Sequence, residues 1–560
     1  MPRLFLLRAF LFTILLSTIL GLASLRVPIA AHAQTRAPRD YDPGTPSPVI
    51  ELWVDPVNGN DANTGLSSGQ AVRGLLSAWN LVPGSLTTHA YRINILPGTI
   101  PCYGDCINWF GDKHGTYAHP LIVRAVNGAG TVTIQGGLNL GNVDYLYLYD
   151  LTLQAGGTAG AFANNVLHCD HCTHLLLRGL TITGLTPADF QEVFKANQSD
   201  YLYVENSDLS GTYQTVLDYF AVRHGHILNS RFHNSGEWCM YLKGGSAYFQ
   251  IEGNELYDCR FGFSAGEGSN FEVMESPWLH YEAYDIKFVN NVLHDIVGLG
   301  LRAAGGYNIL FAHNTLYRVA TDASVGYSLF HATRGGRACV DFSENGVGNA
   351  VAICNGFLDA GGWGTALEGY GNGGEWIPNR NVFVYNNIFY NPAPLQTLYS
   401  HFYIPGSMTP PAHTRNIPNP ARVDVNLQIR GNIIWNGSSA MPLGVEEASA
   451  GCQPSNATCN ATQLRAENAI NTLQPQLVNP AFGNFRPTPS GNVFSAPTFA
   501  IPGFSWSDAP ASPIVPTGNL SNAIPRDRDG NARTSSSPPG AYVGTTTISA
   551  QLVFLPLVRK

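Results

Sequence analysis

The stretch "LYVENSDL", residues 202–209, decides the fold, because it joins an alternating apolar strand to a polar corner and the start of a second strand. Eight other segments repeat the pattern: "LYLYDLTL" (146–153), "LLLRGLTI" (175–182), "GHILNSRF" (225–232), "FQIEGNEL" (249–256), "IKFVNNVL" (286–293), "ILFAHNTL" (309–316), "VFVYNNIF" (382–389) and "LQIRGNII" (427–434). The last residues of successive copies are 29, 27, 23, 24, 37, 23, 73 and 45 positions apart. Periods in the twenties, with no helical pattern between the strands, predict a parallel solenoid in which each repeat forms one coil.

The corners of the copies carry Asn, Gly or Asp, which accept a left-handed backbone. We expect interior asparagines at these corners to form ladders with the coil above. A β-sandwich is the alternative, but it requires antiparallel hairpin turns such as Asn-Gly, and these are scarce. The longer gaps between copies predict coils with long inserted loops.

The composition agrees with an all-β chain. Charged residues make up 12% of the chain and aromatic residues 11%, and there are 59 glycines. Such a chain is poor in helix formers and rich in residues for strands and tight turns. The net charge of −8 argues against nucleic acid as a partner.

The first residues have the pattern of a secretory signal peptide. Arg3 and Arg8 precede an apolar run, and "AHAQ" at 31–34 offers a cleavage site, so we expect a signal peptide at 1–33 and a linker at 34–50. An uncleaved anchor is the alternative, and no later segment is long and apolar enough to cross a bilayer. We therefore expect a secreted or cell-surface protein without a transmembrane segment in its mature chain.

The ten cysteines occur in local couples. In an oxidising compartment such couples are more often disulfides than zinc ligands, because zinc requires a fourfold cluster. For the couple in "HCDHCTH", residues 168–174, a free dithiol is the alternative because the span is short. The expected bridges are Cys102–Cys106, Cys169–Cys172, Cys239–Cys259, Cys339–Cys354 and Cys452–Cys459.

Both ends of the repeat region resemble known proteins. "LWVDPVNGNDANTGLSSGQAVRGLLSAWNLV" (52–82) with "INILPGTI" (93–100), and "NPAFGNFRPTPSG" (479–491) with "DRDGNARTSSSPPGAYVG" (527–544), resemble the opening and closing segments of secreted bacterial right-handed parallel β-helix proteins of the pectate-lyase-like superfamily. The resemblance implies a β-helix domain at 51–486 with an N-terminal capping helix at about 71–81. It also implies a closing segment and a Pro/Ser/Thr-rich tail at 487–560. The fold hosts several chemistries, so it does not by itself assign a reaction.

Counting back from the strand ends places a set of polar residues at one register. Most of them lie thirteen or fourteen residues before a strand end, and each follows an apolar residue. Ser264 and His331 join by the strand pattern alone. Because side chains alternate along a strand, the apolar neighbour points inward and the polar residue outward. The predicted column is His168, Lys195, Asp218, Lys243, Ser264, Arg302 and His331.

A row of cations along a groove suits a linear polysaccharide with one carboxylate per sugar, such as pectate or alginate. Cleavage by β-elimination requires a base for the proton next to the carboxylate and a cation that neutralises the carboxylate. The resemblance to β-helix polysaccharide lyases implies Lys243 as the base and Arg302 as the carboxylate clamp or acid. Lys195, His168 and His331 would extend the substrate-binding sites.

An insertion at 265–285 follows the column residue Ser264. Its Trp278, His280 and Tyr281 would wall one side of the column and hold sugar rings. A decorative loop packed by its own aromatic residues is the alternative.

Asp218 has two interpretations. It forms an ion pair between Lys195 and Lys243, or it binds Ca²⁺, the candidate cofactor, together with Glu237 or Glu192. The dense Asp cluster of calcium-dependent members is not visible in the sequence. A lyase that needs no metal therefore stays open.

Two further functions stay open beside a lyase that acts on an acidic polysaccharide. The first is a non-catalytic, carbohydrate-binding or structural β-helix at the cell surface, because a solenoid face with mixed charge can serve solubility alone. The second, ranked third, is a glycoside hydrolase, which requires two or three convergent carboxylates. We expect the protein to be a monomer.

Overall fold

The computed structural model describes residues 40–102, 109–155, 165–184, 192–322, 325, 327–330, 350–365, 375–396, 399–506, 509–518 and 520–544. All elements named below belong to residues 42–560. The expected signal peptide at 1–33 and the first part of the expected linker lie outside the described residues.

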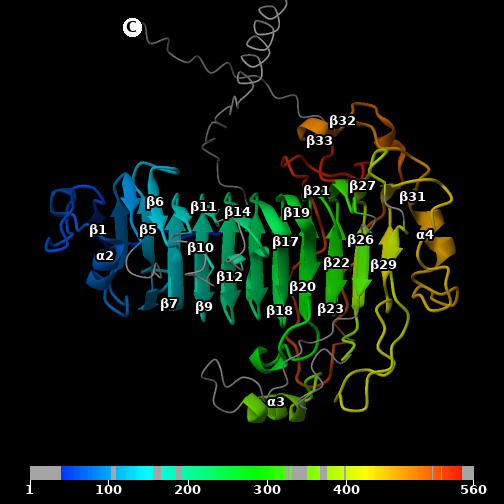
Figure 1. Cartoon of the computed structure of the whole chain (residues 1–560), viewed down its shortest axis with the longest axis horizontal. Coiled ribbons are helices and arrows are strands. Elements are labelled where there is room, and N and C mark those ends of the chain that lie inside the picture. Colours follow the sequence, from blue (N-terminus) through cyan, green and yellow to red (C-terminus); the bar gives the residue numbers. More distant parts are fainter. Residues whose placement is uncertain are drawn as a thin grey trace, which may run out of the picture. The chain divides into compact units, whose positions relative to one another are not determined.

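Parallel strands stack into a right-handed β-helix with three faces (Figure 1), which confirms the predicted fold. The described residues form one 31-stranded sheet that winds around a continuous apolar core. Each coil crosses the three faces in turn. The sequence achieves this because inward apolar residues recur along the strands and a polar corner follows.

The first face carries β4 (Trp109–His114), β9 (Leu167–Asp170), β12 (Glu192–Asn197), β15 (Thr215–Phe220), β22 (Leu301–Ala304), β25 (Tyr327–Phe330) and β28 (Phe402–Tyr403). Three long strands bend around a corner and share this face with a neighbouring one: β7 (Leu138–Tyr149), β17 (Arg231–Lys243) and β19 (Glu255–Ala265).

The second face carries β1 (Val49–Val54), β2 (Ala90–Ile95), β5 (Leu121–Ala125), β10 (Thr173–Arg178), β13 (Asp200–Glu205), β16 (Arg223–Leu228), β18 (Ser246–Glu252), β20 (Ala283–Val289), β23 (Gly306–Ala312), β26 (Arg380–Tyr385) and β29 (Gln428–Arg430). The third face carries β3 (Gly98–Ile100), β6 (Val132–Gln135), β8 (Thr152–Gln154), β11 (Thr181–Thr183), β14 (Asp208–Thr212), β21 (Val292–Ile296), β24 (Thr315–Val319), β27 (Ile388–Tyr390), β30 (Ile433–Trp435) and β31 (Ala469–Ile470).

The nine repeats found in the sequence are one stack on the third face. Their last residues pair strand to strand without a break from Leu153 to Ile434. Each of these nine side chains is at most 1% exposed. The hydrophobic repeat therefore predicted both the strands and their register.

The expected asparagine ladder runs through six coils. Asn254, Asn291, Asn314, Asn387, Asn432 and Asn468 are buried and pass side-chain hydrogen bonds of 2.8–3.2 Å from one coil to the next. Each amide group also satisfies backbone groups at its corner, as Asn314 does with the carbonyl of Phe288 at 2.9 Å. The ladder fixes the corner at one position in every coil because a buried amide must keep its partners.

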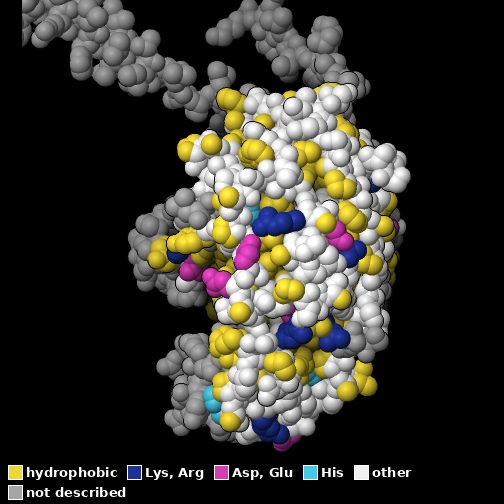
Figure 2. Space-filling model, turned by 90° about the vertical axis from the view of Figure 1, so that its right-hand side faces the viewer, with side chains coloured by type: hydrophobic (Ala, Val, Ile, Leu, Met, Phe, Trp, Pro, Cys, Tyr) yellow, Lys and Arg dark blue, Asp and Glu magenta, His cyan; other side chains and the backbone are white. Residues whose placement is uncertain are grey.

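The ends of the stack are covered. Helix α2 (Leu75–Leu81), with the short helix η2 (Ser68–Gln70) before it, lies at the end near β1 and confirms the predicted cap. Helix α4 (Ala461–Glu467) contacts β29 and β31 at the other end, where apolar side chains are scattered and charged ones are few (Figure 2). Beyond it follow β32 (Leu477–Asn479), η5 (Pro480–Phe482), β33 (Asn484–Pro487) and η6 (Asn492–Ser495).

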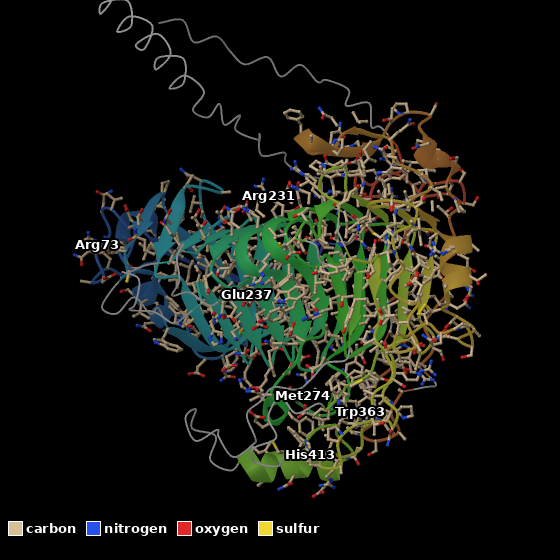
Figure 3. The ribbon with its side chains drawn as sticks, turned by 45° about the vertical axis from the view of Figure 1, so that its right-hand side comes forward. Arg73, Arg231, Glu237, Met274, Trp363 and His413 are labelled. Carbon is tan, nitrogen blue, oxygen red and sulfur yellow. A yellow bond between two sulfur atoms is a disulfide. The ribbon has the colours of Figure 1, made fainter. Side chains whose placement is uncertain are left out.

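Two inserted segments pack together beside the coils. Helix η3 (Phe271–Val273) contacts α3 (Ala350–Asp359), and Phe271, Met274, Leu279, Cys354 and Leu358 form their common apolar cluster. Met274 and Trp363 lie in this region, away from Glu237 on β17 (Figure 3).

Three of the five expected disulfides lie within the described residues and are confirmed: Cys169–Cys172, Cys239–Cys259 and Cys452–Cys459. Cys106 and Cys339 lie outside the described residues, and with them the other two expected bridges. Among the helices of the described part, none has the length and apolar character needed to cross a membrane.

Candidate functional site

The outward column of the first face is real, but its central member differs from the prediction. His168, Lys195 and Asp218 stand opposite one another on β9, β12 and β15. Farther along, Ser264 stands opposite Arg302 on β19 and β22. Between them, the residue opposite both Asp218 and Ser264 is Tyr241.

Lys243 is therefore two positions beyond the column and stands opposite Phe220. The turn at Gly244 and Gly245, both in the left-handed region at φ 67° and 87°, makes the step from the first to the second face one residue longer here than in the preceding coil. The sequence prediction used a spacing of thirteen residues from Lys243 to Leu256, whereas the additional turn residue makes the spacing from the column residue Tyr241 to Leu256 fifteen. At the far end Arg302 pairs with Ser328, and His331 lies outside the described residues.

Asp218 is the centre of a charged cluster, although Lys243 is off register. Its Oδ2 atom is 3.2 Å from the ammonium of Lys195 and 3.5 Å from that of Lys243. The hydroxyl of Tyr241 donates to the same oxygen at 3.2 Å and accepts from Lys243, also at 3.2 Å. Lys195 also lies 3.4 Å from Oε1 of Glu192. Two cations and a phenol thus converge on one carboxylate.

The cluster presents its positive charges to solvent and hides its carboxylates. The Asp218 side chain is 0% exposed and that of Glu192 is 5% exposed, whereas Lys195 and Lys243 are 25% and 15% exposed. A ligand that approaches this face therefore meets ammonium groups before it meets carboxylates.

Glu192 and Asp218 have different protonation states, because burial and neighbouring charges shift their pKa values in opposite directions. Burial, reinforced by the negative charge of Asp218, raises the pKa of Glu192 to about 7. Burial acts in the same direction on Asp218, but Lys243 and Lys195 outweigh it and lower the pKa of that carboxyl. Burial also lowers the affinity of Lys195 for its proton, but the carboxylates of Asp218 and Glu192 raise its pKa above the usual value. Asp218 is the ionised member of the pair.

Tyr241 stays protonated at every physiological pH, because burial and the nearby Asp218 raise its pKa well above 10. Its ring lies edge-on to Trp238, with the ring centroids 6.5 Å apart. The ammonium of Lys243 lies 4.4 Å from the centroid of the Tyr241 ring. The phenol is thus a fixed, neutral proton donor inside the cluster.

Arg302 forms the second cationic position. Its guanidinium lies 4.3 Å from the centroid of Trp238, its Nε donates to Oγ of Ser264 at 2.9 Å, and it forms an ion pair with Glu267 of the insertion. Burial lowers the pKa of Arg302 to about 9, which keeps it cationic at neutral pH. Its side chain is 14% exposed and lies over the indole of Trp238, with the carboxylate of Glu267 as its ion-pair partner.

His168 contributes a neutral side chain. Its Nε2 lies 3.1 Å from Nδ2 of Asn197, and burial lowers its pKa. The structure thus brings together His168, Lys195, Asp218 and Arg302 on one face, with Lys243 beside them. Sequence counting missed Tyr241 and Trp238, which flank the buried residues Cys239 and Met240 in the chain.

The aromatic residues of the insertion do not wall the column. Trp278 is 8% exposed and packs under Arg223, 4.5 Å from its guanidinium, and Tyr281 is 4% exposed and stacks on Tyr307. These partners lie on β16 and β23 of the second face, so the insertion folds over that face. The alternative interpretation, a loop packed by its own aromatic residues, describes them better.

The residues around Asp218 do not fit a calcium ion. Its Oδ2 already receives three donors, two of them ammonium groups that a cation would have to displace. Glu237 lies at a register irregularity of β17 between Ser235 and Trp238. Within the described residues there is no group of three His, Cys, Asp or Glu side chains arranged for a metal.

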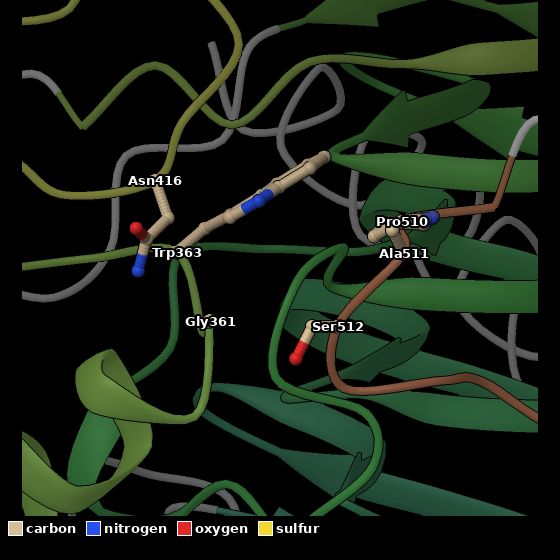
Figure 4. A pocket seen from close by; sticks show the side chains of 6 residues that line it. All are labelled: Gly361, Trp363, Asn416, Pro510, Ala511 and Ser512. Carbon is tan, nitrogen blue, oxygen red and sulfur yellow. The ribbon is translucent and has the colours of Figure 1, made fainter.

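A separate pocket of about 370 Å³ lies away from this cluster, between the inserted segments and the C-terminal part (Figure 4). Its polar groups hold the segments together: Nδ2 of Asn416 donates to the carbonyls of Leu358 and Gly362 at 2.8 Å each, and Oγ of Ser512 donates to the carbonyl of Ala360 at 2.9 Å. We regard this pocket as a packing feature.

Together the fold and the column define a parallel β-helix protein with a cationic outward face. No protein-family model matches the chain, and no curated protein matches it significantly. Among solved structures, the chain is similar to pectate lyase Pel9A, with 13% identity, 90% of this chain and 98% of that chain covered, and a TM-score of 0.43.

It is also similar to XylC in complex with xylose, with 9% identity, coverage of 88% and 98%, and a TM-score of 0.41. A third similar structure is the PL6 family polysaccharide lyase Pedsa3628 from Pseudopedobacter saltans, with 14% identity, coverage of 71% and 92%, and a TM-score of 0.34. Similarity at this level says nothing about the reaction, which has to be inferred from the residues of this chain.

Proposed function

We propose that this protein binds an acidic polysaccharide of the pectate or alginate type along the column and cleaves it by β-elimination. The observation that carries the proposal is the pair of partly exposed ammonium groups, Lys195 and Lys243, on the single buried carboxylate of Asp218. Two positive charges on one negative charge leave a positive surface, and Arg302 extends it. Such a surface is complementary to a polymer with a carboxylate on every sugar.

In the proposed step, Lys243 in its amine form takes the proton from the carbon next to the carboxylate of the substrate. The electron pair left behind forms a carbon–carbon double bond, and the bond from the neighbouring carbon to the glycosidic oxygen breaks. That oxygen receives the proton of Tyr241, which Lys243 then replaces across their 3.2 Å hydrogen bond. The cycle is balanced in protons and requires no metal.

Arg302 holds and neutralises the substrate carboxylate during this step. The structure supplies a stand-in for that carboxylate, since Glu267 forms an ion pair with the guanidinium and is itself 33% exposed. A planar guanidinium fixed over the indole of Trp238 is arranged for a two-point contact with a carboxylate. Lys195 and the neutral His168 bind the neighbouring sugars.

Hydrolysis is a second candidate, favoured by one observation. Glu192, with a pKa near 7, and the ionised Asp218 form an acid and base pair, and both contact the same ammonium of Lys195. Both carboxylates are almost wholly buried, however, and a glycosidase must present them to the sugar. A non-catalytic binding protein would use the same cationic face without cleavage. For all three functions we place the protein in an oxidising, extracellular compartment, in keeping with its disulfides.

The test is the ultraviolet absorbance of unsaturated products from pectate, alginate and glycosaminoglycans, with calcium or with a chelator. We expect absorbance to rise on one of these glycans, and Lys243→Ala to lower the rate at least about 100-fold. Lys113→Ala is the matched control, because Lys113 lies on the same face and donates to the backbone carbonyl of Val82.

The absence of unsaturated product on every glycan, from a chain shown to be folded by circular dichroism, contradicts the lyase proposal. New reducing ends without absorbance would then assign hydrolysis. Binding without any cleavage would assign a binding protein.

A further inference from the structure

Two consecutive glycines follow Lys243, and the turn that they form is held by the insertion that comes after β19. Gly244 donates its backbone N–H to Oε2 of Glu282 at 3.0 Å, and Gly245 donates to the backbone carbonyl of Glu282 at 2.9 Å. Glu282 is 0% exposed, and its side chain also accepts a hydrogen bond from the hydroxyl of Ser269. One residue of the insertion thus accepts from both N–H groups of the turn.

Neither glycine of this turn has room for a larger residue. Both have a left-handed backbone, and a Cβ atom on Gly244 would lie 2.8 Å from the ring of Phe220. A Cβ atom on Gly245 would lie 2.6 Å from the backbone oxygen of Trp278, which belongs to the insertion. The turn is therefore packed between the first face and the insertion, and its course depends on both.

The insertion also interrupts the stack beside Lys243. β17 pairs with β19 as far as Leu242, and β18 pairs with β20 from Ser246 onward. Between these two points the next coil contributes no strand within residues 192–322, which the structure describes without a gap. Lys243 lies at this interruption, and its side chain is 15% exposed, whereas that of Asp218 is 0% exposed. The residues that hold the turn are therefore those at which the insertion rejoins the coil.

The position of the Lys243 backbone decides what its side-chain nitrogen can reach. Its carbonyl accepts hydrogen bonds from the N–H of Ala221 at 3.0 Å and from the hydroxyl of Ser246 at 2.7 Å. Its side chain then extends to the hydroxyl of Tyr241 at 3.2 Å and to Oδ2 of Asp218 at 3.5 Å. A displacement of about 1 Å away from Tyr241 would break this hydrogen bond, and a misplacement of that size costs about 100-fold in rate.

We propose that Glu282 is a positioning residue for Lys243, which it holds in place through the Gly244–Gly245 turn. The inference rests on the proposed function and deepens it, because it names the group that sets the distance from Lys243 to Tyr241. Glu282 acts through the turn and does not touch the substrate, since its side chain is buried. The insertion therefore serves the reaction through its buried end rather than through its aromatic residues.

The test measures the surroundings of Lys243 directly, as well as the rate. Limiting acetic anhydride acetylates accessible lysines fastest, and mass spectrometry gives the acetylated fraction of Lys243 relative to Lys113 in the same chain. We expect Glu282→Ala to raise this labelling ratio about threefold or more and to lower kcat about tenfold or more, with KM changed less than about threefold. Glu282→Gln retains an oxygen that accepts from Gly244, so it should stay close to the wild type in all three quantities.

Two further variants complete the test. Gly244→Ala disturbs the turn directly and should reproduce the result of Glu282→Ala. Glu275→Gln removes a different contact of the insertion, the ion pair with Arg223 at 2.8 Å, and should leave the labelling ratio unchanged. If Glu282→Ala does not fold, Ser269→Ala takes its place, because it removes the hydroxyl that orients the carboxyl group, and the same direction of change is expected.

The labelling ratio separates this inference from the proposed function. An equal ratio in the wild type, Glu282→Ala and Gly244→Ala overturns the positioning role, even where the chain is a lyase. A ratio that rises in both variants of a chain that cleaves no glycan supports the positioning of Lys243 and removes the lyase. A loss of folding stability in Glu282→Ala, without a change in the ratio or in kcat, assigns Glu282 a structural role alone and also overturns the inference.

Discussion

The hydroxyl of Tyr241 donates a hydrogen bond of 3.2 Å to Oδ2 of Asp218, the residue that stands opposite it on the neighbouring strand. The same hydroxyl accepts a hydrogen bond from Lys243. The phenol thus links a lysine that is two positions off the column to the buried carboxylate on the column. It holds the side-chain nitrogen of Lys243 in place. In the proposed step, a proton that this lysine takes up can pass directly to the oxygen of Tyr241.

Tyr241→Phe tests this link. The variant keeps the ring against Trp238 and removes the proton donor, so we expect kcat to fall about 100-fold with KM changed less than about threefold. Steady-state rates of unsaturated product formation measure both constants. Tyr213→Phe, at an exposed turn, is the control. An unchanged kcat would show that another group protonates the leaving oxygen.

Asp218→Asn leaves Lys195 and Lys243 close together without their shared negative charge. Removing one partner from a buried ion pair costs about 3–5 kcal/mol, and we expect a loss of this size in the free energy of unfolding. Urea unfolding followed by circular dichroism measures it. The double variant Asp218→Asn with Lys195→Met should regain part of the loss, because it removes one unpaired cation. If Asp218→Asn is as stable as the wild type, the ammonium groups of Lys195 and Lys243 are solvated and do not depend on the charge of Asp218.

The sequence predicted the stack and much of its outward column because both depend on period alone. Leu153 to Ile434 fall on one register because each inward residue repeats once a coil, whatever the loops between coils do. Tyr241 was missed because its position depends on one additional residue in the Gly244–Gly245 turn, and turn conformation has no period. Trp278 was misplaced for a related reason: which face an insertion covers is decided by packing between distant segments.

Arg302→Lys tests the carboxylate clamp. Lysine keeps the charge but loses the planar two-point contact and the stacking on Trp238, so we expect kcat/KM to fall about tenfold or more. Glu267→Gln should act in the opposite direction, because it removes the carboxylate that occupies Arg302 in the free protein. Initial rates at low substrate concentration measure both effects. Equal losses in the two variants would indicate that the ion pair itself, rather than a free Arg302, supports activity.

The asparagine ladder predicts that one substitution within it lowers the free energy of unfolding substantially. Asn314→Ala removes the acceptor for the backbone N–H and the side chain of Asn291, at 2.9 and 3.2 Å, and leaves the carbonyl of Phe288 without its donor. Buried groups that lose their partners cost about 1–3 kcal/mol each, so we expect a loss of about 3 kcal/mol in the free energy of unfolding. The exposed Asn58→Ala is the control in urea unfolding. A loss as small as that of the control would mean that the ladder fixes the register of the coils but does not stabilise the fold.

The raised pKa of Glu192 predicts how the stability of the fold depends on pH. Its pKa of about 7 in the folded chain lies above its ordinary value of 4.5, so the folded state holds a proton that the unfolded state releases. The stabilisation is complete below pH 4.5 and is lost as the pH rises from 4.5 through about 7, by up to about 3 kcal/mol. Glu192→Gln stays neutral at every pH, so the wild type should lose stability relative to this variant across that interval. Urea unfolding of the two proteins at several pH values from about 4 to 8 measures the difference, and a difference that does not vary with pH would show that Glu192 is ionised in the folded chain.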